Sequence, residues 1–197
     1  MTRATGAGSA ARRRLVLLTG PVAAGKTTVA ERLATLAREQ GRTAAAVDMD
    51  EIVAVVAGRD WTSVRSADRI AACRLASAIV TELLDLGTEV VTVAGTTLSP
   101  FEWDEVIAHL HPAPPILHVL LRVSVVEAQR RASRDPRRGS TRDPGFVASL
   151  AGAVAWEAVR HHDVELDTDV LGVNEVVAAI ATRVFAHGGP DAGGRPQ

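Results

Sequence analysis

The stretch Gly20–Thr28, GPVAAGKTT, has the residue types and the spacing of a loop that binds phosphate groups. It fits the pattern G-x-x-x-x-G-K-[ST], whose glycines let the backbone curl so that successive N–H groups point at phosphate oxygens. The lysine of this pattern reaches the β- and γ-phosphates, and the threonine places its hydroxyl on Mg²⁺. We therefore expect a nucleotide to contact the whole stretch, which comprises Gly20, Pro21, Val22, Ala23, Ala24, Gly25, Lys26, Thr27 and Thr28.

Lys26 is the only lysine in the chain, and the remaining basic residues, out of a total of 22, are all arginines. Lysine carries a compact charge on a flexible stem, whereas the planar guanidinium of arginine needs more room and a different approach. A lysine kept at this one position favours a catalytic role for Lys26 over the alternative, a glycine-rich turn without function.

Two carboxylates, Asp48 and Asp50, follow the second predicted strand. We interpret Asp48 as the general base that takes a proton from a substrate hydroxyl and, with Thr27, as a magnesium ligand. Asp50 is expected to bind the substrate, or to orient a metal-bound water. The alternative is that either residue is the N-cap of a helix that begins at Glu51, a position for which Asp50 is the better candidate.

Six arginines crowd into the segment from residue 130 to residue 142. Arginines on a helix that leads into a loop rich in glycine and proline can close over a triphosphate and stabilise the transferred phosphoryl group. We expect this catalytic role for Arg131, Arg134 and Arg138. A solvated basic face is the alternative. Binding of nucleic acid is not supported, because no aromatic residues interleave with the arginines.

Further candidates follow the second and third strands. Thr96 and Thr97 come directly after the third strand and are expected to line the substrate site, although capping of the strand end explains them equally well. Arg65 and Arg69 lie one helical turn apart and can hold an acidic group of the substrate; of the two, Arg65 is predicted to bind it. Cys73 is the only cysteine and is expected to be a small core residue.

Short β-rich runs alternate with helical patterns along the chain and must position these residues. Strands are predicted at 14–19, 43–47, 88–93, 116–122 and 164–166, and helices at 29–40, 66–86, 100–110, 125–134, 146–160 and 174–186. This alternation predicts an α/β fold, a parallel sheet covered by helices on both faces. Ligands of such sheets bind at the carboxyl ends of the strands, where the polar residues named above should converge.

The composition is that of an ordinary globular protein, with 47% hydrophobic residues and a net charge of −1. This charge gives no reason to expect nucleic acid or membrane partners, and no apolar run is long enough for a membrane span. We predict one domain at 14–186 between disordered tails at 1–13 and 187–197, and a cytoplasmic location.

The order of these features resembles the small P-loop kinases of the nucleoside-monophosphate-kinase type. Over residues 14–185 the chain is most similar to the chloramphenicol-phosphotransferase-like, shikimate and gluconate kinases. The resemblance implies a three-layer P-loop fold with strand order 2-3-1-4-5, ATP with Mg²⁺, and phosphoryl transfer to a hydroxyl of a small molecule. Asp48 matches the acid that serves as base in such families. Arg131, Arg134 and Arg138 match their lid arginines by pattern.

One departure from these kinases concerns the third strand. Relatives often carry an aspartate at its end, where this chain has Ala94 within VTVAGTT. Asp48 is then expected to carry more of the metal contact. Two alternatives stay open: a nucleoside or nucleotide kinase, and a P-loop nucleotide-binding module without phosphotransfer. The acceptor, the choice of ATP or GTP, and the oligomeric state are not specified by the sequence.

Overall fold

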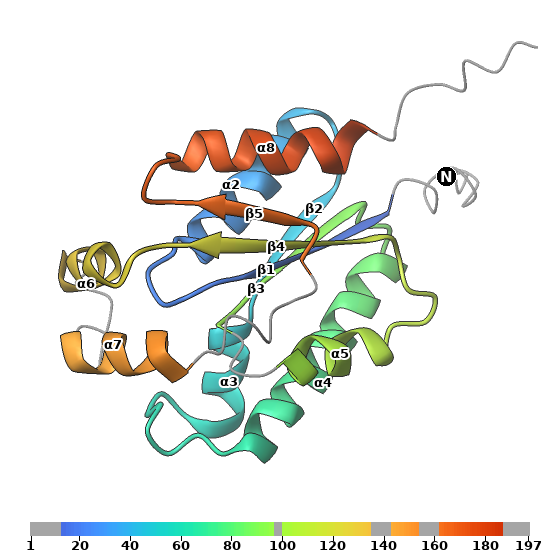
Figure 1. The fold of residues 1–197 in the computed structure, drawn as a ribbon. Coiled ribbons are helices and arrows are strands. Elements are labelled where there is room, and N and C mark those ends of the chain that lie inside the picture. Colours follow the sequence, from blue (N-terminus) through green and yellow to red (C-terminus); the bar gives the residue numbers. More distant parts are fainter. Residues whose placement is uncertain (1–12, 97–99, 135–142, 154–161, 187–197) are drawn as a thin grey trace, which may run out of the picture.

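The computed structural model describes residues 13–96, 100–134, 143–153 and 162–186. Its core is one sheet of parallel strands in the order β2-β3-β1-β4-β5 (Figure 1). The strands are β1 (Arg14–Thr19), β2 (Ala44–Asp48), β3 (Val90–Ala94), β4 (Ile116–Arg122) and β5 (Val164–Asp167). This architecture confirms the predicted fold class and strand order.

The helices connect these strands and cover both faces of the sheet (Figure 1). They are α2 (Lys26–Glu39), α3 (Met49–Ala57), α4 (Ser66–Asp85), α5 (Pro100–Ala108), α6 (Val125–Arg134), α7 (Pro144–Ala153) and α8 (Val173–Phe185). Helix α2 begins three residues before its predicted start, directly after Gly25. The part of the predicted helix at 154–160 lies outside the described residues, as do the predicted tail at 187–197 and almost all of the tail at 1–13.

The sequence predicts a helix at α3 only in the alternative interpretation, in which Asp48 or Asp50 is an N-cap and the helix begins at Glu51. The structure begins it at Met49, because the carboxylate of Asp48 accepts a hydrogen bond from the backbone N–H of Asp50 at 2.8 Å and so caps the helix. The expectation that Asp50 is the better cap is therefore wrong. Asp50 lies in the first turn of the helix instead.

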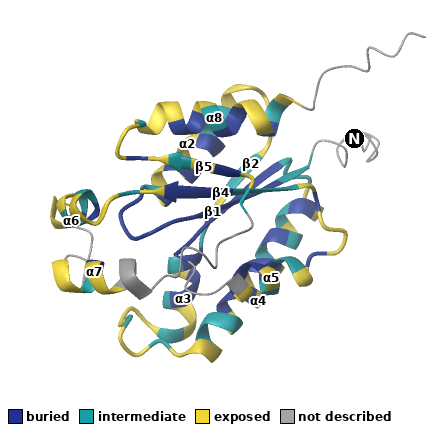
Figure 2. Ribbon diagram, viewed as in Figure 1, coloured by how far each residue is buried: buried dark blue, intermediate teal, exposed yellow. Residues whose placement is uncertain are grey.

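The side chains of β1 alternate between two hydrophobic layers, as the geometry of a strand requires. Val16 and Leu18 pack with α2 and α8 on one face of the sheet. Leu15 and Leu17 pack with α3, α4 and α5 on the other. The central strands β1 and β3 are almost entirely buried, and Figure 2 colours most of β1 as buried. Burying both faces of the sheet fixes the carboxyl ends of the strands, from which the candidate site is built.

Cys73 belongs to the layer formed by α3, α4 and α5, and it is buried, which confirms its prediction as a core residue. Burial raises the pKa of its thiol to about 11, so the thiolate that reacts with electrophiles is scarce at neutral pH. None of the described helices is both long and apolar enough to cross a membrane.

Candidate functional site

The loop between β1 and α2 depends on its two glycines in different ways. A Cβ atom on Gly20 would lie 2.4 Å from the carbonyl oxygen of Leu121, so any other residue would collide with β4. Gly25 has a φ of 88°, in the left-handed region that favours glycine. It precedes α2 without a side-chain cap, and the first turn of α2 has no acidic residue. The N–H groups at the start of α2 therefore remain available to an anion.

Lys26 lies across this loop. Its ammonium group donates hydrogen bonds to the carbonyl oxygens of Gly20, at 2.9 Å, and of Pro21, at 2.8 Å. The side chain is buried, with 7% of its surface exposed. The compact positive charge is thus held inside the curl of the backbone, next to the N-terminus of α2.

Thr27 and Asp48 meet at the same edge of the sheet. The hydroxyl of Thr27 donates a hydrogen bond of 2.7 Å to one carboxylate oxygen of Asp48, whose other oxygen caps α3. A hydroxyl and a carboxylate oxygen in contact are a suitable donor set for Mg²⁺, which commonly takes only one or two protein ligands beside substrate phosphates. These two residues therefore fit the expected metal.

The residue that replaces the strand-three aspartate is buried. Ala94 ends β3 and lies opposite Asp48 in the register of β2 and β3. Within the described ranges, no group of three or more His, Cys, Asp or Glu residues is placed to hold a metal ion. At this edge of β2 and β3, Asp48 is the carboxylate in contact with Thr27.

Asp50 is partly buried next to this pair. Its carboxylate receives one long hydrogen bond, 3.5 Å from the backbone N–H of Thr96. Burial raises the pKa of Asp50, and the nearby charge of Asp48 adds to this rise, whereas the charge of Lys26 opposes it. The carboxyl group of Asp50 therefore lies close to the charges of Lys26 and Asp48 and accepts only this one long hydrogen bond.

Thr96 connects Asp50 to a buried ion pair. The guanidinium of Arg69, in the first turn of α4, donates to the carbonyl oxygen of Thr96 at 2.7 Å. It also forms two hydrogen bonds of 2.7 Å with the carboxylate of Glu102 on α5. The hydroxyl of Thr96 is buried without a hydrogen-bond partner in the structure. Thr97 lies outside the described residues.

Arg65, which we had selected over Arg69, is exposed and pairs with Asp68 in the first turn of α4. The structure therefore brings Arg69, and not Arg65, next to the carboxylates of the site. Glu102 was missed altogether, and no local sequence pattern marks it, because its partner is 33 positions away in the chain.

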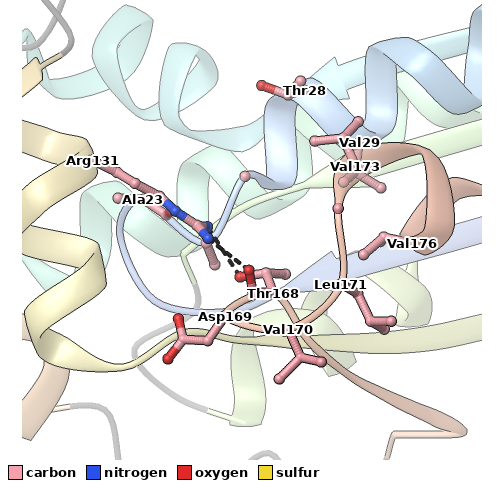
Figure 3. A pocket seen from close by; sticks show the side chains of 13 residues that line it. Ala23, Thr28, Val29, Arg131, Thr168, Asp169, Val170, Leu171, Val173 and Val176 are labelled. Carbon is pink, nitrogen blue, oxygen red and sulfur yellow. Dashed lines mark hydrogen bonds between the residues drawn. The ribbon is translucent and has the colours of Figure 1, made fainter.

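A pocket of about 470 Å³ opens on the other side of the phosphate-binding loop (Figure 3). Ala23, Ala24 and Gly25 form one wall, and the segment from Thr168 to Val173 forms the opposite one. Val29 and Val176 add apolar surface from α2 and α8. The pocket lining combines apolar side chains with polar ones, such as Arg131, Thr168 and Asp169, which suits a flat ring attached to phosphates.

Arg131 closes one end of this pocket (Figure 3). Its guanidinium donates to the carbonyl oxygen of Thr168 at 2.6 Å and to its hydroxyl at 3.1 Å, and it contacts the carbonyl oxygen of Ala23 at 3.4 Å. The structure thus places Arg131 on the pocket wall. Arg134 is exposed at the end of α6, and Arg138 lies outside the described residues.

A parallel sheet in this order, with a glycine-rich loop and a lysine at the first helix, defines a P-loop fold of the small-molecule kinase type. A family model for adenylylsulphate kinase matches residues 12–152, which is more than half of the chain. The chain belongs to the adenylylsulphate kinase family. It is therefore a P-loop kinase, an ATP-dependent phosphotransferase that acts on a small molecule.

Solved structures agree in fold. The APS kinase of Mycobacterium tuberculosis in complex with AMPPNP and APS is 21% identical, with a TM-score of 0.63 over 89% of this chain and 98% of that one. A sugar kinase from Janibacter sp. HTCC2649 is 19% identical (TM-score 0.63, 86% and 93% covered). Shikimate kinase from Acinetobacter baumannii is 17% identical (TM-score 0.56, 88% and 95% covered). A search of curated protein sequences gave no match.

Proposed function

We propose that this kinase transfers the γ-phosphoryl group of ATP to a hydroxyl of a small molecule. The observation that carries the proposal is the contact between Thr27 and Asp48, with Lys26 and Asp50 beside it. It joins a phosphate-binding lysine, a metal-binding pair and a further carboxylate at one edge of the sheet. These are the groups that phosphoryl transfer requires.

We assign the two carboxylates different roles. Both oxygens of Asp48 already accept hydrogen bonds, from Thr27 and from the backbone of α3, which favours a metal-holding role over that of a base. Asp50 accepts only the long bond from Thr96. Asp50 then takes the proton of the acceptor hydroxyl, whose oxygen forms the new bond to the γ-phosphorus while the bond to the β–γ bridging oxygen breaks and ADP leaves.

The remaining residues bind and orient the nucleotide. Thr27 and Asp48 would hold a magnesium ion, which when bound neutralises charge on the β- and γ-phosphates. The N–H groups of the loop and the start of α2 surround the phosphates, and Lys26 stabilises negative charge on the transferred group. The pocket behind the loop takes the adenine ring, with Arg131 against one end of it.

The test is the release of ADP from ATP and Mg²⁺ by the full chain. A panel of hydroxylated compounds, including sugars, nucleosides, antibiotics and adenylylsulphate, is compared with a reaction without acceptor. We expect one or more compounds to stimulate ADP release, and neither Lys26→Ala nor Asp48→Asn to show this stimulation. Tight nucleotide binding without stimulation by any acceptor would contradict the proposal and favour a nucleotide-binding module.

A further inference from the structure

The phosphate-binding loop holds an alanine in a backbone conformation that favours glycine. Ala23 has a φ of 65°, and among the described residues it is the only one besides glycines with a positive φ. In the left-handed region the Cβ atom comes too close to the following carbonyl oxygen, a cost that glycine does not have. Such a strained residue persists only where the surrounding structure holds it in place.

The strained residue belongs to a turn that also bears on Lys26. The backbone N–H of Ala24 donates to the carbonyl oxygen of Pro21 at 3.2 Å, which closes a turn with Ala23 at its third position. The same carbonyl oxygen accepts a hydrogen bond of 2.8 Å from the ammonium group of Lys26. The commoner turn, with a negative φ at the third position, differs by a reversal of the peptide group between Val22 and Ala23. That reversal would change the pattern of N–H and carbonyl groups that the loop offers to phosphate oxygens.

Contacts from outside the loop hold the turn. Ala23 is buried in an apolar cluster that joins the loop to α6 and α7 and consists of Val22, Ala23, Ala128, Ala132 and Val147. Ala128 and Ala132 lie one turn apart on α6, so this helix presents a small apolar face to the loop. The carbonyl oxygen of Ala23 also accepts a hydrogen bond from Arg131 at 3.4 Å. A closely packed cluster favours the one loop conformation that fits it.

Helix α7 contributes Val147 to this cluster and is tied to α6. The carboxylate of Asp143 caps α7 by accepting from the backbone N–H of Phe146 at 2.7 Å. The side-chain amide of Gln129 on α6 donates to the carbonyl oxygen of Pro144 at 3.0 Å. The two helices lie side by side (Figure 1). Val147 is buried but does not line the nucleotide pocket, so an effect of Val147 on the nucleotide has to act through the loop.

We propose that Val147 is a positioning residue for nucleotide binding, because its packing in the cluster holds Ala23 and the phosphate-binding loop in the strained conformation. The inference rests on the proposed function, since it concerns the nucleotide of that reaction. Glycine at position 23 would take the same φ without support. The effect of Val147 on nucleotide affinity should therefore depend on the residue at position 23, a dependence that a purely structural core residue would not show.

The experiment is a double-mutant cycle, with the affinity of the full chain for AMPPNP and Mg²⁺ measured by calorimetry. The proteins compared are the wild type, Val147→Ala, Ala23→Gly and the variant that combines both changes. Val80→Ala is the matched control, because it removes the same two methyl groups from a buried valine in the layer formed by α3, α4 and α5.

We expect Val147→Ala to weaken the binding of AMPPNP by about fivefold or more, and Val80→Ala by less than about twofold. In the background of Ala23→Gly, the change Val147→Ala should weaken binding by less than about twofold. Equal losses in the two backgrounds, or wild-type affinity in Val147→Ala, would overturn the inference while leaving the proposed function intact. If the wild type itself did not bind AMPPNP, both would fail.

Hydrogen exchange provides a second measurement, made without nucleotide. The amides of residues 20–28 should exchange at least about fivefold faster in Val147→Ala than in the wild type, and at the wild-type rate in Val80→Ala. Unchanged exchange of this segment in Val147→Ala would show that the loop keeps its conformation without Val147, and the inference would be wrong.

Discussion

The proposed phosphate side, which is the loop from Gly20 to the start of α2, and the proposed acceptor side, which is the group of side chains around Asp50, are built in different ways. The phosphate side consists mainly of consecutive backbone groups, from Gly20 to the start of α2, with one side chain, Lys26, folded over them. The acceptor side consists of side chains from separate helices, such as Arg69 on α4 and Glu102 on α5. A continuous segment can be recognised in a sequence, whereas a set of distant side chains becomes visible only in the fold.

The strongest test of the phosphate side is Lys26→Arg. The ammonium of Lys26 is buried and donates to two carbonyl oxygens at 2.8 and 2.9 Å, a space that suits a compact charge better than a planar guanidinium. We expect the variant to lose about 10³-fold or more in kcat, because a guanidinium would not place its positive charge at the transferred phosphoryl group as the ammonium does. Steady-state kinetics check this, with Arg32→Lys on the exposed face of α2 as the control. Near-normal turnover would mean that the lysine has no special role.

Asp50→Asn tests the division of roles on the acceptor side. Loss of the proton acceptor should lower kcat by about 10²- to 10⁴-fold. The affinity for AMPPNP should hardly change, because the Asp50 side chain forms no hydrogen bond with the described loop and accepts only from Thr96. Asp48→Asn should instead weaken the dependence of binding on Mg²⁺. If Asp50→Asn retained full activity, Asp48 would have to be reconsidered as the base.

Asp50→Asn should also be more stable than the wild type in the absence of metal. Burial raises the pKa of Asp50 in the folded protein above its ordinary value of 3.8, so the folded state binds more protons between the two values. The stability of the wild type therefore falls as pH rises from the ordinary pKa through the raised pKa of Asp50. Asparagine cannot ionise and avoids this loss. Thermal unfolding at pH 7 in EDTA should give a higher Tm for Asp50→Asn, and an equal or lower Tm would show that the ionised carboxylate is not destabilising.

The two ion pairs between α4 and α5 offer a direct contrast in stability. Glu102→Ala leaves the buried Arg69 unpaired and should cost about 3–5 kcal/mol in the free energy of unfolding. Glu105→Ala breaks a pair in which 62% of the Arg74 side chain is exposed, and should cost no more than about 1 kcal/mol. Urea denaturation measures both. Equal effects would mean that the buried pair is no more important than a surface pair.

Much of the fold followed from local patterns. The bounds of β1 and β4 were predicted to the residue, because each is a short apolar run ended by a turn or a polar residue. The strand order followed from the resemblance to P-loop kinases. Helix α3 was not predicted as a firm element, because its valines and isoleucine are weak helix formers and the cap that starts it, Asp48, also ends a strand.

The candidate site was predictable to the extent that it is local in sequence. The phosphate-binding loop and Asp48 were found from spacing alone. The difference between Arg65 and Arg69 could not be predicted, because Arg65 is the N-cap of α4, Arg69 lies in its first turn, and only tertiary packing makes one exposed and the other buried. Glu102 had no sequence signal, since nothing near it in the chain indicates that α5 packs against α4 at this point.

Arg131 offers the finest test, because it is predicted as a catalytic residue and yet lies on the wall of the pocket next to the phosphate-binding loop. The test separates a role in nucleotide binding from a role in catalysis. If it orders the segment after β5 through Thr168, Arg131→Leu should raise the KM for ATP by about tenfold with little change in kcat, as expected for lost binding energy. If it stabilises the transferred phosphoryl group, kcat should fall instead. Arg130→Leu is the matched control, since Arg130 also pairs with Glu127 but does not line the pocket.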